Sequence, residues 1–382
     1  MPSVSSPPGL RRVMTICGTR PEAIKLAPVI RQLQWRADWQ TIVTVTAQHR
    51  EMMDQALALF GITPDYDLDL MQPGQTVFAV TSRVLLGLQP VLEQARPDLV
   101  LVQGDTTTVM AGALAAFYLK IPVGHVEAGL RSFDRFQPFP EEMNRKLATA
   151  LADLHFAPTD LARRNLLAEG VPAGRIFVTG NTAVDALLHA AGLNPPPRAP
   201  QLDGLDPGRR LVVVTTHRRE NWGEPIRQVC RAIRRLVERF DDVEVLYALH
   251  LNPVVQSAAR EELRGAPRVQ LLDAIDYGPW VQILKRAHLI LTDSGGIQEE
   301  APSLGKPVLV LRNVTERPEG LEAGTLKVVG TGTEAVFAEA SRLLTDEAEY
   351  TRMAQAHNPY GDGQAAGRIV ATIAAFFAGQ IA

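Results

Sequence analysis

Short apolar runs alternate with amphipathic runs through most of this chain, and that alternation restricts the folds open to it. Runs rich in valine, isoleucine and leucine are typical of strands buried on both faces, and the runs between them have helical spacing. Strands that alternate with helices predict parallel sheets with helices on both sides. In the first half of the chain the predicted strands are 13–17, 42–46, 99–103, 123–127, 155–157 and 176–179.

A proline- and glycine-rich break divides this pattern. Residues 192–200 and 203–208 fit neither a helix nor a strand, so we interpret 192–210 as a linker. Beyond it the predicted strands are 211–215, 245–249, 269–272, 289–292, 308–311 and 327–329. The sequence therefore predicts an N-terminal domain at 10–191, a C-terminal domain at 211–363, and a last helix at 364–382 that packs back on the first domain.

The length of 382 residues suits two domains better than one. We expect both to be doubly wound, Rossmann-like α/β domains. Ligands in such sheets bind beyond the carboxyl ends of the strands. With two domains facing each other, the predicted ligand site is the cleft between them.

Composition excludes several classes of protein. Hydrophobic residues make up 46% and charged residues 21% of the chain, which is typical of globular proteins. A net charge of -3 gives no sign of a nucleic-acid partner, and no apolar run is long enough to span a membrane. Residues 1–9 lack the apolar core of a signal peptide, so we expect a cytoplasmic protein. Two distant cysteines, Cys17 and Cys230, predict neither a disulfide framework nor a metal cluster.

The most informative turn is Ser294-Gly295-Gly296, which follows the apolar run 287–291. A helix is predicted to begin after it, at Ile297. Glycines allow a ligand close to the backbone, and a helix start offers unpaired N–H groups, so the turn fits a phosphate. Glu300, one helical turn on, could accept hydrogen bonds from ribose hydroxyls. An ordinary tight turn capped by Ser294 explains this stretch equally well.

Polar residues also follow five predicted strands, where a ligand is expected. These stretches are Gly18–Lys25, Gln48–Met52, Gly104–Thr108, His125–Arg131 and Thr216–Asn221. Arg20 and Lys25 in the first stretch can meet an anion. One polar strand end is an ordinary helix cap, but five that carry carboxylates and several cations favour a functional site.

The blocks that carry these residues resemble a known family from Val13 almost to the C-terminus. The matching blocks are Gly18–Pro28, Thr46–Met52, Gly104–Thr108, Gly124–Arg131, Pro140–Arg145, Thr216–Asn221 and Thr292–Pro302. They resemble the non-hydrolysing UDP-N-acetylglucosamine (UDP-GlcNAc) 2-epimerases. The resemblance implies a fold like that of GT-B glycosyltransferases and a homodimer. It also implies conversion of UDP-GlcNAc to UDP-N-acetylmannosamine (UDP-ManNAc), which supplies cell-envelope polysaccharides.

The reaction implied by this resemblance breaks the C1–O bond to UDP and removes the C2 proton, which gives 2-acetamidoglucal. Re-addition of UDP with protonation on the opposite face inverts C2, without a redox cofactor or a metal. The family's motifs place Asp105, Glu127 and Glu141 at the sugar and His217 at the departing diphosphate. The assignment of base and acid among the carboxylates stays open.

The resemblance also implies the binding residues. Those for the substrate are Arg20, Lys25, Arg145, Ile275, Trp280, Ser294, Gly295, Gly296, Glu300 and Arg317. The family can place a glutamine where this chain has Ile275, which would leave only backbone groups to pair with uracil, with Trp280 packing nearby. Gln48, His49 and Gln75 are implied to hold a second, allosteric UDP-GlcNAc.

Three alternatives remain. Glu141 and Arg145 lie four residues apart on a predicted helix and could form only a surface ion pair. A GT-B glycosyltransferase would share the fold and the nucleotide site but transfer the sugar to an acceptor. A non-catalytic sugar-nucleotide sensor would need no paired acid and base, so the charged strand ends argue against it.

Overall fold

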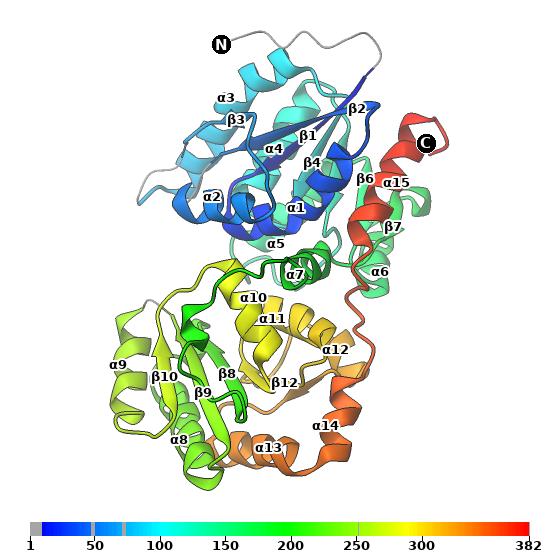
Figure 1. Cartoon of the computed structure of the whole chain (residues 1–382). Coiled ribbons are helices and arrows are strands. Elements are labelled where there is room, and N and C mark those ends of the chain that lie inside the picture. The colour runs from blue at the N-terminus through cyan, green and yellow to red at the C-terminus, as the bar shows by residue number, and fades with distance from the viewer. Residues whose placement is uncertain (1–9, 47–49, 71–73, 251, 382) are drawn as a thin grey trace. The chain divides into compact units, whose positions relative to one another are not determined.

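The computed structural model describes residues 10–46, 50–70, 74–250 and 252–381. The chain forms two compact units (Figure 1). The first consists of the chain up to Ala186 together with Gly361–Ala382, and the second is Leu187–Tyr360. The sequence places these divisions later, at 191 and 363, because it gives no boundary inside helix α7 (Thr182–Ala191), where the units meet along the chain.

The first unit is built on a parallel sheet with the strand order β3-β2-β1-β4-β5-β6-β7. The strands are β1 (Arg11–Cys17), β2 (Trp39–Val45), β3 (Tyr66–Asp67), β4 (Leu99–Gln103), β5 (Val123–Val126), β6 (Leu154–Ala157) and β7 (Ile176–Val178). The order reverses between β1 and β4, so a crevice is expected beyond their carboxyl ends.

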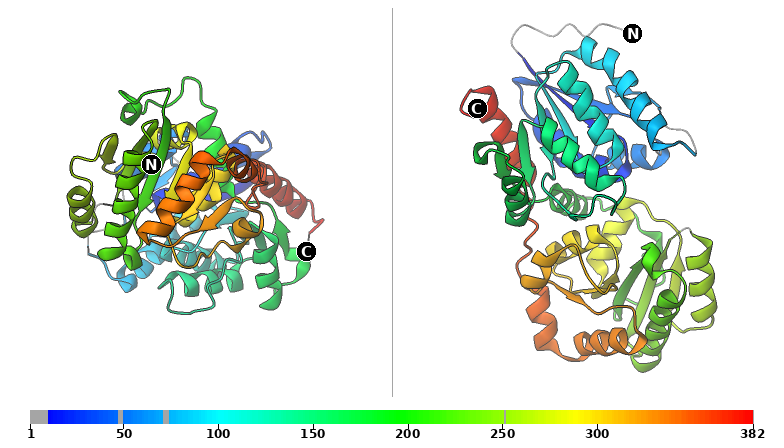
Figure 2. Two further views of the ribbon diagram at one scale, coloured as in Figure 1. Left: turned by 90° about the horizontal axis from the view of Figure 1, so that it is seen from below. Right: turned by 180° about the vertical axis from the view of Figure 1, so that it is seen from behind.

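Helices cover both faces of this sheet. They are α1 (Arg20–Gln34), α2 (Arg50–Leu59), α3 (Val77–Ala95), α4 (Thr107–Tyr118), α5 (Glu141–Leu151), α6 (Asp160–Ala168), the start of α7, and α15 (Ala365–Phe377). Helices α3, α4 and α5 pack side by side on one face, as the right view of Figure 2 shows. Helix α15 packs on α1, and Phe377 meets Trp39 edge to face at a centroid distance of 5.4 Å.

The second unit has a parallel sheet with the order β10-β9-β8-β11-β12-β13, which reverses between β8 and β11. Its strands are β8 (Arg210–Thr216), β9 (Val243–Leu249), β10 (Val269–Leu272), β11 (Leu289–Thr292), β12 (Val308–Val310) and β13 (Leu326–Val328). Its helices are α8 (Glu224–Arg239), α9 (Pro253–Glu262), α10 (Tyr277–Arg286), α11 (Gly295–Glu300), α12 (Pro318–Glu322), α13 (Thr333–Thr345) and α14 (Glu347–Ala354). Helices α8, α9 and α13 cover one face of the sheet, and α10 lies on the other (Figures 1 and 2).

The predicted fold class, two α/β domains with parallel sheets, is confirmed. The central strands are buried along their whole length, as Val212 to Val214 in β8 illustrate. Within 192–209, all of which is described, the only regular element is a 3-10 helix at Pro200–Leu202. None of the described helices is both long and apolar enough to cross a membrane.

Two details of the prediction are wrong. The helix after β11 begins at Gly295 rather than Ile297, because the two glycines take helical conformation despite their low propensity. The two-residue edge strand β3 was not predicted, because two residues are too few for a periodic pattern.

Gly129, just after β5, gives a test of the fold. Its φ is +92°, and a Cβ there would lie 2.3 Å from the carbonyl oxygen of Ala162. Gly170 has a similar φ of +86° with nothing within 4 Å of its added Cβ. We expect Gly170→Ala to cost about 1–2 kcal/mol for the left-handed backbone, and Gly129→Ala to cost roughly a further 1–3 kcal/mol for the clash. Urea unfolding of both variants measures the difference, and equal midpoints would contradict this packing.

Candidate active site

Asp105 lies two residues after the end of β4 and is held by helix α5. Arg145 donates to its Oδ2 from Nε at 3.0 Å and from Nη2 at 2.6 Å, and Asn144 Nδ2 donates to its backbone carbonyl at 2.9 Å. The third donor group of Arg145 binds Glu142 at 3.0 Å. Burial alone would lower the pKa of Arg145, but Asp105 and Glu142 outweigh it and the pKa is raised. Arg145 therefore fixes the Asp105 carboxylate as part of a charged triad.

The turn that carries Asp105 is also fixed from β5. Gly104 has a φ of +83°, and its N–H donates to the carbonyl of Val126 at 3.0 Å. Its own carbonyl accepts from Nε2 of His125 at 2.7 Å. Burial lowers the pKa of His125 to about 4, so the ring is neutral at pH 7. Since a carbonyl can only accept, the single ring proton is on Nε2.

Glu127 follows β5 and faces helix α1. Lys25 Nζ lies 2.5 Å from its Oε2, and Gln103 Nε2 donates to the same oxygen at 2.8 Å. The φ of Glu127 is +65°, a left-handed conformation that costs energy for any residue with a side chain. Such strained residues persist where their surroundings hold them, and they cluster at functional sites.

Glu141 and Glu142, the first residues of α5, differ in their surroundings. Glu142 is fully buried and accepts hydrogen bonds from the backbone N–H groups of Ser132 and Phe133 as well as from Arg145. Glu141 Oε2 is buried and has no hydrogen-bond partner among the described residues. The surface ion pair between Glu141 and Arg145 is not what forms, because Arg145 directs its donors to Asp105 and Glu142. Glu141 thus has an acceptor oxygen available.

In the second unit His217 is held by the buried carboxylate of Asp293. Asp293 accepts from the backbone N–H groups of His217 and Arg218 at 3.0 Å and from Asn221 Nδ2 at 2.8 Å. His217 Nδ1 lies 2.9 Å from Asp293 Oδ1. Burial would raise the pKa of Asp293, but these donors and the His217 ring together lower it. Asp293 is therefore a carboxylate that keeps the hydrogen on Nδ1, which leaves Nε2 of the part-exposed ring for a ligand.

The Ser294-Gly295-Gly296 turn is bordered by two guanidinium groups. A Cβ on Gly295 would lie 3.4 Å from Nη2 of Arg317 and 3.7 Å from Nη2 of Arg218. Arg317 is oriented by Glu299 at 2.5 Å, and Nε of Arg218 is buried without a partner among the described residues. Ser294 makes no capping hydrogen bond with its side chain, so the simple capped turn is not what forms. Two cations beside backbone N–H groups suit an anion.

The remaining predicted residues are distributed around these two clusters. Arg20 begins α1 and is half-buried. Ile275 lies just before α10 and Trp280 within it, and both are half-buried. Glu300 ends α11. Burial, together with the charge of Glu300, raises the pKa of the Tyr277 phenol. Gln75 Nε2 donates to the carbonyl of Leu70 at 3.1 Å. Gln48 and His49 lie outside the described residues.

Four residues of these clusters were missed from the sequence: Glu22, His125, Glu142 and Asp293. Glu22 had a local signal, since Thr19 and Glu22 have the spacing of a capping box, and the structure contains that box. Asp293 and His125 bind residues that are distant in sequence, 76 and 21 positions away. Glu142 binds nearer residues, but two of these are backbone N–H groups of the loop before α5. Pattern reading along the chain does not detect such pairs.

The fold and the two clusters define a two-domain α/β protein with carboxylates at one set of strand ends and, at another, a glycine turn bordered by two guanidinium groups. A family model described as UDP-N-acetylglucosamine 2-epimerase matches residues 31–374. The chain belongs to the UDP-N-acetylglucosamine 2-epimerase family.

Individual relatives agree with this assignment. The UDP-N-acetylglucosamine 2-epimerase of Bacillus subtilis is 53% identical over 94% of both chains. That of Escherichia coli K12 is 51% identical over 94% of this chain and 97% of its own. A crystal structure of the enzyme from Neisseria meningitidis bound to UDP-GlcNAc has a TM-score of 0.87 and 45% identity, with coverage of 95% of this chain and 99% of that one.

Proposed function

We propose that this protein interconverts UDP-GlcNAc and UDP-ManNAc by inverting C2 of the sugar. The observation that carries the proposal is the group of three carboxylates at neighbouring strand and helix ends, of which Asp105 and Glu127 are each fixed by a cation. The C2 proton of the sugar is very weakly acidic, so its removal needs a positioned base and relief of developing charge. The relative from Neisseria meningitidis was solved with the same nucleotide sugar bound.

The proposed route is elimination followed by re-addition. The C1–O bond to UDP breaks and the C2 proton leaves, which gives 2-acetamidoglucal and UDP. UDP then returns to C1 while C2 takes a proton on the opposite face. Because the hydrogen leaves and returns as a proton, no redox cofactor is needed.

We propose that Asp105, Glu127 and Glu141 act on the sugar and that the residues around His217 bind the diphosphate. Asp105 and Glu127 can stabilise the positive charge that develops at C1 or exchange the C2 proton, and Glu141 has an acceptor oxygen available. His217, with Nδ1 tied to Asp293, can donate from Nε2 to a phosphate oxygen when it is protonated. Arg218, Arg317 and the Ser294-Gly296 turn then compensate the charge of the leaving diphosphate.

Turnover in deuterium oxide tests the reaction. UDP-ManNAc formed from UDP-GlcNAc should carry deuterium at C2, because the proton removed there exchanges with solvent. Proton NMR of the product measures the incorporation. Conversion with full retention of the original hydrogen would contradict elimination, and absence of conversion would reject the function.

In the same assay Asp105→Asn, Glu127→Gln and Glu141→Gln should each lower turnover by roughly a hundredfold to ten-thousandfold, the range of general acid–base steps. Glu347→Gln on the exposed first turn of α14 is the control and should keep full turnover. Near-native turnover in all three variants would show that the sugar does not react at this cluster.

The anion-binding turn makes a prediction about UDP. A Cβ on Gly296 would have only Ser294 Oγ nearby, at 4.0 Å, so Gly296→Val should fold and place its side chain where the diphosphate lies. Gly332, just before α13, offers the matched control, because its added Cβ also has 4.0 Å of space at a helix start. Calorimetry should show UDP affinity reduced at least tenfold in Gly296→Val, a loss of about 1.4 kcal/mol, and unchanged in Gly332→Val. Equal affinities in the two variants would place the diphosphate elsewhere.

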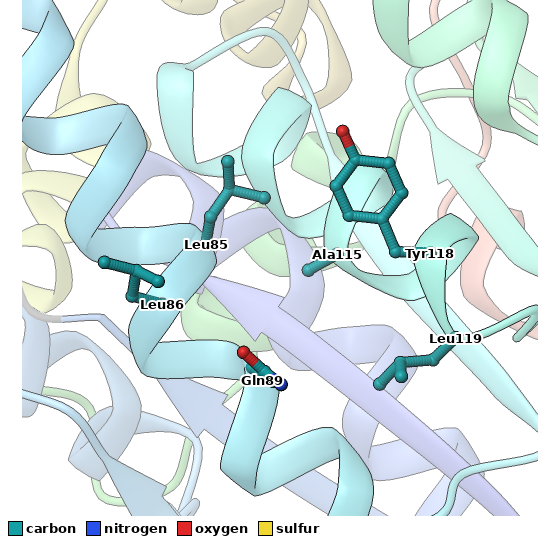
Figure 3. A pocket seen from close by; sticks show the side chains of 6 residues that line it. All are labelled: Leu85, Leu86, Gln89, Ala115, Tyr118 and Leu119. Carbon is teal, nitrogen blue, oxygen red and sulfur yellow. The ribbon is translucent and has the colours of Figure 1, made fainter.

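We further propose that the protein is a homodimer joined through α3 and α4. This face exposes Phe78, Leu86 and Tyr118 by 88%, 71% and 68%. Leu86 and Tyr118 also border a cavity of about 340 Å³, which Figure 3 shows between the two helices. Water-exposed apolar area of this kind is typical of an interaction surface.

Leu86→Lys should separate the dimer. In a two-fold interface each substitution occurs twice, and each buried leucine contributes about 1.5–3 kcal/mol. Light scattering should give the monomer mass for Leu86→Lys at concentrations where the wild type and Val314→Lys, at a residue that is 70% exposed in the second unit, stay dimeric. A dimeric Leu86→Lys protein would move the interface elsewhere.

The remaining proposals concern regulation and biological context. A second UDP-GlcNAc held by Gln48, His49 and Gln75 would favour the active form through its differential affinity for two states. Only Gln75 lies among the described residues, and this hypothesis stays a prediction. We place the reaction in the cytoplasm, where its product would supply cell-envelope polysaccharide synthesis.

A further inference from the structure

Glu22, in the first turn of α1, is a buried carboxylate to which none of the roles above applies. It is only 2% exposed. Its Oε2 accepts from the backbone N–H groups of Gly18 at 2.5 Å and Thr19 at 2.9 Å. Its Oε1 accepts from the hydroxyl of Thr106. The two carboxylate oxygens thus join the turn after β1 to the turn after β4.

Thr106 connects this carboxylate to the candidate sugar site. It follows Asp105 directly, and its Oγ1 also caps α4 by accepting from the N–H of Val109 at 3.4 Å. The turn after β1 also lies close to the start of α4. A Cβ on Gly18 would lie 2.3 Å from the hydroxyl of Thr108.

We propose that Glu22 is a positioning residue for the epimerisation: its carboxylate holds the β4–α4 turn, and with it Asp105, against the β1–α1 turn. The proposal rests on the proposed role of Asp105 at the sugar. Glu22 acts through Thr106 and the backbone and does not touch the substrate.

The ionised form of Glu22 is the one that accepts all three hydrogen bonds, because a protonated oxygen must find an acceptor for its own hydrogen. The pKa of Glu22 is raised to about 7, chiefly by burial. The hydrogen bonds from Thr106, Gly18 and Thr19 act in the opposite direction and lower it, and the charge of Asp105 adds to the rise. Asp105 is itself paired with Arg145. On β1, burial and Glu22 raise the pKa of the Cys17 thiol, which stays neutral. The Glu22 carboxyl therefore titrates in the range where the enzyme would work.

The direction of the pH effect follows from this pKa. A carboxyl that titrates near 7 in the folded chain and near 4.5 in the unfolded chain favours folding in its protonated form. Its contribution to stability is complete below about pH 4.5 and is lost as the pH rises through 7. Over the same rise in pH, Glu22 becomes the ionised carboxylate that accepts three hydrogen bonds and positions Asp105. Activity should therefore increase in the pH range where this stability contribution is lost.

Two substitutions at Glu22 separate positioning from simple packing. Glu22→Gln can still accept both backbone N–H groups on its oxygen and donate to Thr106 from its amide, but it does not titrate. It should keep kcat for UDP-GlcNAc within a few-fold of wild type at pH 8 and lose the acid limb of the kcat profile near pH 7. Glu22→Ala releases the turn and should lower kcat by roughly ten- to a hundredfold, with less effect on KM, because misplacing a group by 1 Å costs up to that much.

Two further variants complete the experiment. Thr106→Val keeps the shape of the side chain but removes its hydroxyl, so it should lower kcat as Glu22→Ala does. It serves as the test if Glu22→Ala does not fold. Glu244→Gln alters a comparably buried carboxyl in the second unit, which accepts from Asp206 N–H at 3.2 Å, and should leave kcat and its pH profile unchanged. An acid limb that persists in Glu22→Gln, or wild-type kcat in both Glu22→Ala and Thr106→Val, would overturn the proposal.

Failure of the proposed function can be told apart from failure of this inference. If the wild-type protein converts no UDP-GlcNAc, the function is rejected, and the positioning of Asp105 in catalysis falls with it. The connection between the two turns is then read from Tm alone. The Tm of the wild type should fall more between pH 5 and 8 than that of Glu22→Gln, and parallel curves would show that Glu22 does not link the turns through a titrating carboxyl.

Discussion

Parallel pairing of β1, β4 and β5 is the constraint on which the candidate site depends. Val13 lies opposite Leu99, and Val100 lies opposite Val123, so the three strands run in register toward the same edge of the sheet. Their carboxyl ends therefore bring Gly18, Asp105 and Glu127 to one side, although Gly18 and Glu127 are more than a hundred residues apart in the sequence. A shift of one residue would turn every strand side chain to the opposite face and separate this group. The apolar core determines where the charged residues meet.

Collecting charged groups at a buried edge requires partners for each of them, and these connect the elements further. Arg145 joins α5 to the β4 turn, and Lys25 joins α1 to the end of β5. Removing one partner of such a buried pair leaves an uncompensated charge and is more costly than replacing both. In the second unit the single carboxylate of Asp293 organises the His217 turn by accepting from two backbone N–H groups and from Asn221. Both clusters use a buried carboxylate as an acceptor for backbone donors of a neighbouring turn.

The sequence predicted the elements well where local signals suffice. Strands 99–103 and 289–292 have the predicted bounds, because continuous apolar runs between turn residues identify a buried strand. The prediction of a helix start at Ile297 failed because Gly295 and Gly296 form the first turn of α11 despite the low helix propensity of glycine. Asp105, Glu127 and His217 lie in polar stretches at predicted strand ends, and the family resemblance then selected them within those stretches. Some of their partners could not be predicted. Glu142 and Asp293 lie in the matching blocks, but only the folded chain shows which groups their carboxylates bind.

The first unit also retains features that cost stability near the same strand ends. Glu127 has a left-handed backbone, and Glu22 is an acid buried without a cation among the partners described for it. Local conformational strain costs on the order of 1–3 kcal/mol, and a protein folds more stably without it. Both features lie beside Asp105 or its sheet neighbours rather than in the apolar core, where the described strands follow ordinary packing. Proteins depart from locally favourable choices mainly where function requires a fixed polar geometry. The coincidence of strain, buried acid and paired carboxylates at one edge therefore supports the placement of the sugar there independently of any sequence motif.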